Sequence, residues 1–175
     1  MERRNITDSP MEIYIHIPFC IKKCDYCDFL SGPAGEKEKE EYVKMLVDEI
    51  RNCPDTVQNY RVISVFFGGG TPSLLTGEQI GRLMDTVREI FTLDEDAEIT
   101  MEMNPGTVTE EKLRKYRQAG VNRLSIGLQS VNDEELRLLG RIHTYEEFRE
   151  AYHLARVNGF SNINVDLISA IPGQT

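Results

Sequence analysis

The feature of this sequence that most constrains its fold is the alternation of short apolar segments with longer amphipathic ones. In the amphipathic segments, apolar residues recur at helical spacing. No hairpin signal separates one apolar segment from the next. Such an alternation is typical of a parallel sheet whose strands are joined by right-handed helical crossovers. We therefore predict an α/β fold with strands at residues 13–17, 62–67, 98–103, 123–128 and 163–168.

Capping residues predict where the helices between these strands begin and end. Thr76 with Gln79 forms a capping box, and Thr144 with Glu147 opens another helix. Gly120 and Gly159 are suited to end two helices. The last helix is expected to turn Phe148, Ala151, Tyr152 and Ala155 inward. The predicted helical ranges are 36–52, a segment after Thr76, 110–119, 132–139 and 144–159.

Three of the four cysteines, Cys20, Cys24 and Cys27, stand in the spacing C-x3-C-x2-C directly after the first predicted strand. Because proline cannot donate to a strand ladder, Pro18 ends that strand and leaves the thiols on a loop. Three readings are open: an iron–sulfur cluster with one open iron, a zinc site with a fourth ligand, or cysteines without a metal. Neither candidate fourth zinc ligand is well placed, since His16 lies within the strand and Cys53 is distant.

Polar or glycine-rich residues follow each predicted strand at or near its carboxyl end. In parallel sheets these ends meet at one edge, where α/β barrels and open α/β sheets place their active sites. Because all five strands share this feature, we predict one functional site at that edge. The residues are the cysteine loop, the turn Gly68-Gly69-Gly70-Thr71, Glu102 with Asn104, Gln129 and Asp166.

Composition excludes some classes of function. The chain has 175 residues, of which 40% are hydrophobic and 28% charged, as in ordinary globular domains. Its net charge is −9 without a basic block, which argues against nucleic acid as the main partner. No apolar run approaches membrane-spanning length, and the first residues lack the apolar core of a signal peptide. Clustered cysteines indicate a reducing compartment, so we expect a cytoplasmic protein.

Several motifs carry a family resemblance across residues 11–175. In order, they read YIHIPFC-x3-C-x-YC-DF, FFGGGTPSLL, MEMNPGT, GVNRLSIGLQS, LGRIH and NINVDLI-x3-PGQT. They resemble the oxygen-independent coproporphyrinogen III oxidases of the radical S-adenosylmethionine (SAM) family, and most of all the branch of HemW-type heme chaperones. The resemblance implies a partial (β/α)6 barrel, here truncated after about five parallel strands. Residues 1–11 are then a leader, and residues 12–175 an incomplete core domain without the family's sixth strand and C-terminal domain.

The resemblance also implies a site. Cys20, Cys24 and Cys27 match the ligands of a [4Fe–4S] cluster. Glycines that let the backbone approach a ligand, carboxylates suited to hydroxyls or an ammonium, and an arginine suited to a carboxylate match the SAM contacts. Taken singly, each of these would more often be an ordinary turn, surface or sheet-edge residue. The matching positions are Tyr14, Gly69, Gly70, Thr71, Glu102, Gln129, Arg141 and Asp166.

In this family the reduced cluster gives one electron to SAM, which splits into methionine and a 5′-deoxyadenosyl radical. The oxidases use that radical to convert propionate side chains into vinyl groups. They carry a further cysteine two positions after the third, where this sequence has Phe29. Phe29 favours a heme chaperone over the alternative oxidase, so the resemblance leaves open whether the protein is an enzyme. The implied partners are heme or a porphyrin, an apo-hemoprotein acceptor and an electron donor, with membrane contact only through a client protein. A zinc-stabilised α/β domain without radical chemistry is the third candidate.

Overall fold

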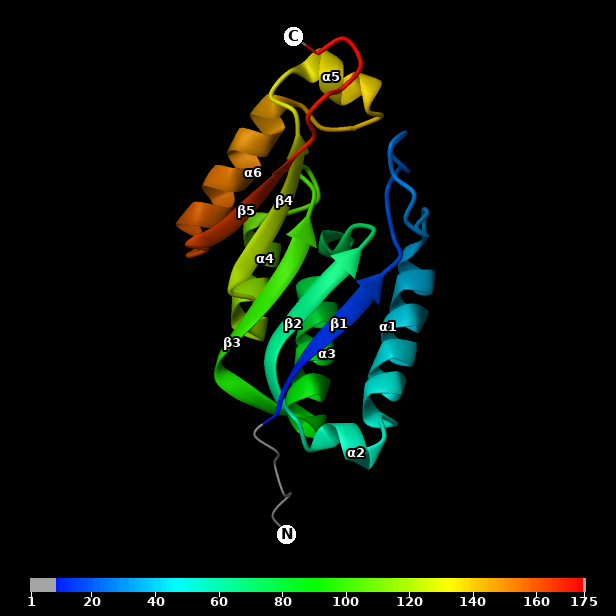
Figure 1. Cartoon of the computed structure of the whole chain (residues 1–175), viewed down its shortest axis with the longest axis vertical. Coiled ribbons are helices and arrows are strands. Elements are labelled where there is room, and N and C mark those ends of the chain that lie inside the picture. Colours follow the sequence, from blue (N-terminus) through cyan, green and yellow to red (C-terminus); the bar gives the residue numbers. More distant parts are fainter. Residues whose placement is uncertain (1–8, 175) are drawn as a thin grey trace.

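The structure is a computed structural model that describes residues 9–174. These residues form one parallel sheet in the order β1-β2-β3-β4-β5 (Figure 1). Each strand therefore pairs with the next one along the chain, and all five carboxyl ends meet at one edge. The strands are β1 (Pro10–Ile17), β2 (Arg61–Gly69), β3 (Thr92–Met103), β4 (Arg123–Gln129) and β5 (Asn162–Leu167).

The longer helices form a layer on one face of this sheet. Helix α1 packs against α3, α3 against α4, and α4 against α6 (Figure 1). The short helices α2 and α5 and the 3-10 turn η1 lie in the connections. Their bounds are α1 (Glu36–Arg51), α2 (Asp55–Gln58), η1 (Pro72–Leu74), α3 (Gly77–Ile90), α4 (Glu110–Ala119), α5 (Asp133–Leu138) and α6 (Tyr145–Val157).

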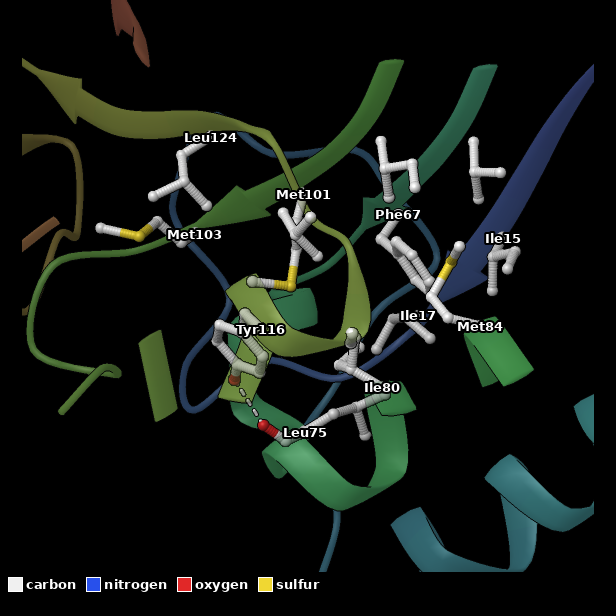
Figure 2. Close-up of a cluster of buried hydrophobic side chains, with 14 of the residues drawn as sticks. Ile15, Ile17, Phe67, Leu75, Ile80, Met84, Met101, Met103, Tyr116 and Leu124 are labelled. Atoms are coloured by element: carbon white, nitrogen blue, oxygen red, sulfur yellow. Dashed lines mark hydrogen bonds between the residues drawn. The ribbon is translucent and has the colours of Figure 1, made fainter. Parts of the chain in front are cut away.

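The core lies between the sheet and this helix layer. Because side chains alternate along a strand, every second residue faces the helices. Ile17, Phe67 and Met101 are fully buried there in one cluster with Ile80 and Leu83 of α3. Figure 2 shows Met101, Met103 and Leu124 of the sheet above Tyr116 of α4. Fully burying one such side chain contributes about 1.5–3 kcal/mol to the free energy of unfolding. The apolar contacts on this face therefore hold the helix layer against the sheet.

The opposite face of the sheet is polar. Glu102 of β3 and Ser125 of β4 lie side by side in the sheet register, and Asp166 of β5 lies one step further toward the carboxyl edge. They alternate with buried apolar residues such as Met103 and Ile126, and therefore point away from the helix layer. Polar groups of three strands thus gather near the carboxyl edge.

The predicted type and order of strands and helices are confirmed, with differences at the ends. β3 begins at Thr92 rather than at residue 98. The polar segment before residue 98 joins the sheet because Thr92 pairs with Arg61, whose side chain forms an ion pair with Asp94. β1 begins at Pro10, so the last two residues of the predicted leader belong to the sheet. Leader residues 1–8 lie outside the described part of the chain.

Two further differences concern helices. The short helix α2 was not predicted, because four residues are too few to show helical periodicity. The prediction for Tyr152 is wrong, since this side chain is exposed. The centroid of its ring lies 6.0 Å from that of Phe148, whereas Phe148, Ala151 and Ala155 are buried as predicted.

Tyr116 ties α4 to the turn that follows β2. It is fully buried, and its hydroxyl donates to the Leu75 carbonyl at 2.6 Å (Figure 2). Tyr116→Phe is expected to lower the free energy of unfolding by about 1–2 kcal/mol, because a buried carbonyl loses its donor. Urea unfolding followed by circular dichroism measures this loss. Tyr60→Phe, at a partly exposed position, is the control, and an equal loss in both variants would contradict the prediction.

Candidate functional site

The cysteine loop joins β1 to α1 and lies on the carboxyl edge of the sheet. Backbone hydrogen bonds fix its start: Gly70 N donates to Ile17 O at 2.8 Å, and Thr71 N donates to Phe19 O at 2.7 Å. A Cβ at Gly70 would lie 2.6 Å from Phe19 O and 3.0 Å from Cys20 Sγ. Only glycine therefore lets the turn after β2 approach the cysteine loop this closely.

A second contact holds the middle of the loop against the end of α5. Asp25 N donates to Leu139 O at 3.1 Å. The next residue, Gly140, has φ of 72°, and a Cβ there would lie 2.8 Å from a carboxylate oxygen of Asp25. Two segments distant in the sequence, the turn after β2 and the end of α5, thus anchor the cysteine loop.

One pocket at this edge collects residues from the cysteine loop, which follows β1, and from the strands β2, β3, β4 and β5 or the turns that follow them. Figure 1 shows that the strand arrows all point toward the end of the sheet where this loop lies. The pocket contains the three loop cysteines and all the predicted SAM contacts except Tyr14. Its lining is Cys20, Lys22, Lys23, Cys24, Tyr26, Cys27, Phe29, Gly69, Gly70, Thr71, Glu102, Met103, Asn104, Ser125, Gly127, Gln129, Arg141 and Asp166.

Tyr14 lies outside this pocket. In the sheet register it pairs with Phe66, which pairs with Thr100, two residues before Glu102. Tyr14 is thus one layer below the pocket and lines a separate cavity between β1 and α1. Its hydroxyl shares a hydrogen bond of 3.0 Å with Nδ1 of His16. The SAM contact of Tyr14 stays a prediction, without support from this geometry.

Two carboxylates face the pocket from neighbouring parts of the sheet. Glu102 accepts a hydrogen bond from Gly69 N at 3.1 Å. Asp166 accepts from Asn164 Nδ2 at 2.7 Å and from Ser125 Oγ at 3.2 Å. Burial raises the pKa of Glu102 above its ordinary value, and the charge of Asp166 raises it further. The pair is therefore an acceptor site suited to hydroxyl or ammonium donors.

Arg141 brings a positive charge next to the cysteines. Its Nη2 donates to Gly127 O at 2.6 Å, and its Nη1 lies 3.7 Å from Cys24 Sγ and 3.4 Å from Tyr26 Oη. Burial raises the pKa of Tyr26 to about 12, so its phenol stays protonated at neutral pH. The Nε of Arg141 is buried without a hydrogen-bond partner among residues 9–174. The Nε–H group is therefore a donor of the guanidinium that no described residue accepts from.

Some residues of the pocket were not predicted. Ser125 and Gly127 precede Gln129 on β4 at intervals of two, so counting back along the strand would have found them. Lys22 and Lys23 lie between Cys20 and Cys24, and their position in that spacing was the available signal. These lysines give the mouth of the pocket positive charge in a chain with a net charge of −9.

The donor set bears on which metal group the pocket suits. All four cysteines are free thiols, and Cys53 lies with Tyr14 in the other cavity. Within the described range, no three His, Cys, Asp or Glu side chains are arranged to hold a single metal ion. In a four-iron cluster each cysteine binds a different iron, so three thiols can share one pocket without meeting at one point. Three free thiols on one loop are therefore a donor set that fits a four-iron cluster.

A parallel α/β sheet with a three-cysteine loop over the carboxyl ends of its strands defines a class of protein, the radical SAM proteins. The chain belongs to the Radical SAM superfamily, whose family model matches residues 14–175. This confirms the predicted family and the predicted partial-barrel fold.

Two bacterial proteins and one solved structure are similar to most of this chain. The chain is 46% identical to the heme chaperone HemW of Escherichia coli over 167 residues, covering 95% of this chain and 44% of that protein. It is 40% identical to HemW of Haemophilus influenzae over 171 residues, covering 95% and 45%. The structure of coproporphyrinogen III oxidase (HemN) from E. coli, described as a radical SAM enzyme, superimposes with a TM-score of 0.87 at 37% identity, covering 96% and 39%. The chain thus spans less than half the length of these relatives.

Among the described residues, no helix is both long and apolar enough to cross a bilayer.

Proposed function

We propose that this chain holds a [4Fe–4S] cluster on Cys20, Cys24 and Cys27, binds SAM beside it, and serves as the core of a heme chaperone. The observation that carries the proposal is the shared pocket. Three free thiols from the loop after β1 and polar groups from the ends of β2, β3, β4 and β5 line it together. The heme chaperone function is proposed because the relatives at 46% and 40% identity are heme chaperones.

Each residue has a physical role in this proposal. When bound, the cluster supplies the single electron that SAM chemistry requires. Gly69 and Gly70 let the turn after β2 pack closely against His16 and the cysteine loop, where a Cβ at either position would clash, and this turn lines the ligand pocket. Glu102 and Asp166 accept from the ammonium and hydroxyl groups of SAM. Arg141 binds its carboxylate by charge-assisted hydrogen bonds.

Phe29 separates the chaperone from the second candidate, an oxygen-independent coproporphyrinogen III oxidase. It is exposed, lines the pocket, and stands where the resemblance places an additional cysteine in the oxidases. The TM-score of 0.87 with HemN keeps the oxidase as the alternative, because the scaffold itself suits both. The proposed partners are heme or a porphyrin, an apo-hemoprotein that accepts it, and an electron donor.

Anaerobic reconstitution with iron and sulfide tests the cluster first. A brown protein whose visible absorbance depends on the loop cysteines supports the proposal, whereas a colourless protein that binds zinc would overturn it. The reconstituted protein is then incubated with SAM and either heme or coproporphyrinogen III. The chaperone predicts stable heme binding and no vinyl product. Conversion of propionate groups to vinyl groups would establish the oxidase instead.

A further inference from the structure

A continuous chain of hydrogen bonds joins two of the three loop cysteines through the side chain of Asn104. Thr71 Oγ1 lies 3.6 Å from Cys20 Sγ, and Asn104 Nδ2 lies 3.0 Å from Thr71 Oγ1. On the other side, Asn104 Oδ1 lies 2.8 Å from Nη2 of Arg141, whose Nη1 lies 3.7 Å from Cys24 Sγ. Asn104 is the middle link between the ends of β2 and β3 and the segment after α5.

Donor capacity determines the direction of each hydrogen bond in this chain. A guanidinium can only donate, so the atom of Asn104 that faces Arg141 is its carbonyl oxygen. The NH2 group of the amide then faces Thr71 and donates to its hydroxyl oxygen. This leaves the hydroxyl proton free to point at Cys20 Sγ. At both ends of the chain, a donor is directed at a cysteine sulfur.

The surroundings of Asn104 hold this amide in place. Its backbone N donates to Ser73 Oγ at 3.3 Å, and its carbonyl accepts from Thr107 Oγ1 at 2.7 Å. On the neighbouring strand, a Cβ at Gly127 would lie 3.0 Å from Asn104 Oδ1 and 3.2 Å from Arg141 Nη2. The glycine therefore leaves the space that the contact between Asn104 and Arg141 needs.

We propose that Asn104 is a positioning residue that raises the reduction potential of the cluster by orienting Thr71 and Arg141 as donors to Cys20 and Cys24. This inference rests on the cluster-binding function proposed above. A reduced cluster carries one more negative charge than an oxidised one. Hydrogen bonds to the cysteine sulfurs stabilise that charge and so favour the reduced form. The role of Asn104 is indirect, because its amide reaches the sulfurs only through its two partners.

Asn104→Asp tests the direction of the hydrogen bonds. The new carboxylate keeps the size of the amide and still accepts from Arg141, but it cannot donate. The Thr71 hydroxyl then turns its proton toward the carboxylate and away from Cys20. We expect the ratio of reduced to oxidised cluster at a fixed potential to fall on the order of tenfold, equal to about 59 mV for a one-electron couple. The measurement is a dithionite titration of the reconstituted chain without SAM, monitored by electron paramagnetic resonance.

A double-mutant cycle separates this effect from the added negative charge. Thr71→Val removes the hydroxyl without adding charge, and is expected to lower the reduced fraction about threefold, whereas Thr71→Ser restores it. In the Asn104→Asp background, Thr71→Val should cause almost no further change, because the proton has already turned away from Cys20. Additive shifts would show that the two residues act independently and would overturn the proposal.

The controls distinguish the possible failures. Asn122→Asp makes the same substitution where the amide accepts from Ile99 N and donates to Ala97 O, away from the pocket, and should leave the potential unchanged. If Asn104→Asp holds no cluster, Thr71→Val and Thr71→Ser test the proposal in its place. Equal reduction potentials of the cluster in these two variants would overturn it. If the unmodified chain takes up no iron and sulfide, the proposed cluster function fails, and this inference fails with it. If the unmodified chain does take up iron and sulfide, but the variants have the same reduction potential as the unmodified chain, only the role of Asn104 is refuted and the cluster function stands.

Discussion

Cys20→Ala, Cys24→Ala and Cys27→Ala are each expected to abolish the cluster, whereas Cys53→Ala leaves it intact. The three loop thiols line one pocket, and three is the smallest ligand set that holds a four-iron cluster with one open iron. Losing any one of them leaves two ligands on a loop anchored at fixed points, which no fourth thiol can reach. Iron and sulfide analysis after anaerobic reconstitution measures the loss.

Cys53→Ala is the matched control for this prediction. Its thiol lies past the end of α1 and lines the separate cavity between β1 and α1. Circular dichroism should show the same fold in all four variants, because none of the cysteines is fully buried. Full iron content in a loop variant, or loss of iron only in Cys53→Ala, would contradict the ligand assignment.

Glu102→Ala and Asp166→Ala are each expected to weaken SAM binding about tenfold to a hundredfold without unfolding the protein. Each removes an acceptor that faces the pocket, and a hydrogen bond to a charged group contributes about 1.5–3 kcal/mol. Isothermal titration calorimetry with SAM measures the change in affinity. Because burial raises the pKa of Glu102, we also expect SAM affinity to fall on acidification at a higher pH than an ordinary glutamate would cause.

Glu98→Ala is the control for a carboxylate on the same face of the same strand. Glu98 lies two layers below the pocket, where its side chain pairs with Arg123 at 3.7 Å. Its removal should leave SAM affinity unchanged, and circular dichroism confirms the fold of all three variants. Unchanged affinity in Glu102→Ala and Asp166→Ala, with a normal fold, would rule out their proposed roles.

The sequence by itself determined the fold class and most of the candidate site. Alternation of apolar segments with helical periodicity is a local property, so it predicted the order of strands and helices without any contact being known. Because parallel strands end at one edge, it also predicted that the cysteine loop, Thr71, Glu102 and Asp166 would share a site. The structure places all of these in one pocket.

Only the tertiary structure decided how these residues connect. Tyr14 is excluded from the pocket by the register of β1 on β2, which places it level with Phe66 rather than with the strand end. Arg141 reaches Cys24 across a separation of 117 residues, because the packing of α5 brings the following segment onto the cysteine loop. Asn104 acquires its central position from Gly127 on the neighbouring strand. Register and loop packing are settled by contacts across the whole core, so local sequence patterns alone do not fix them.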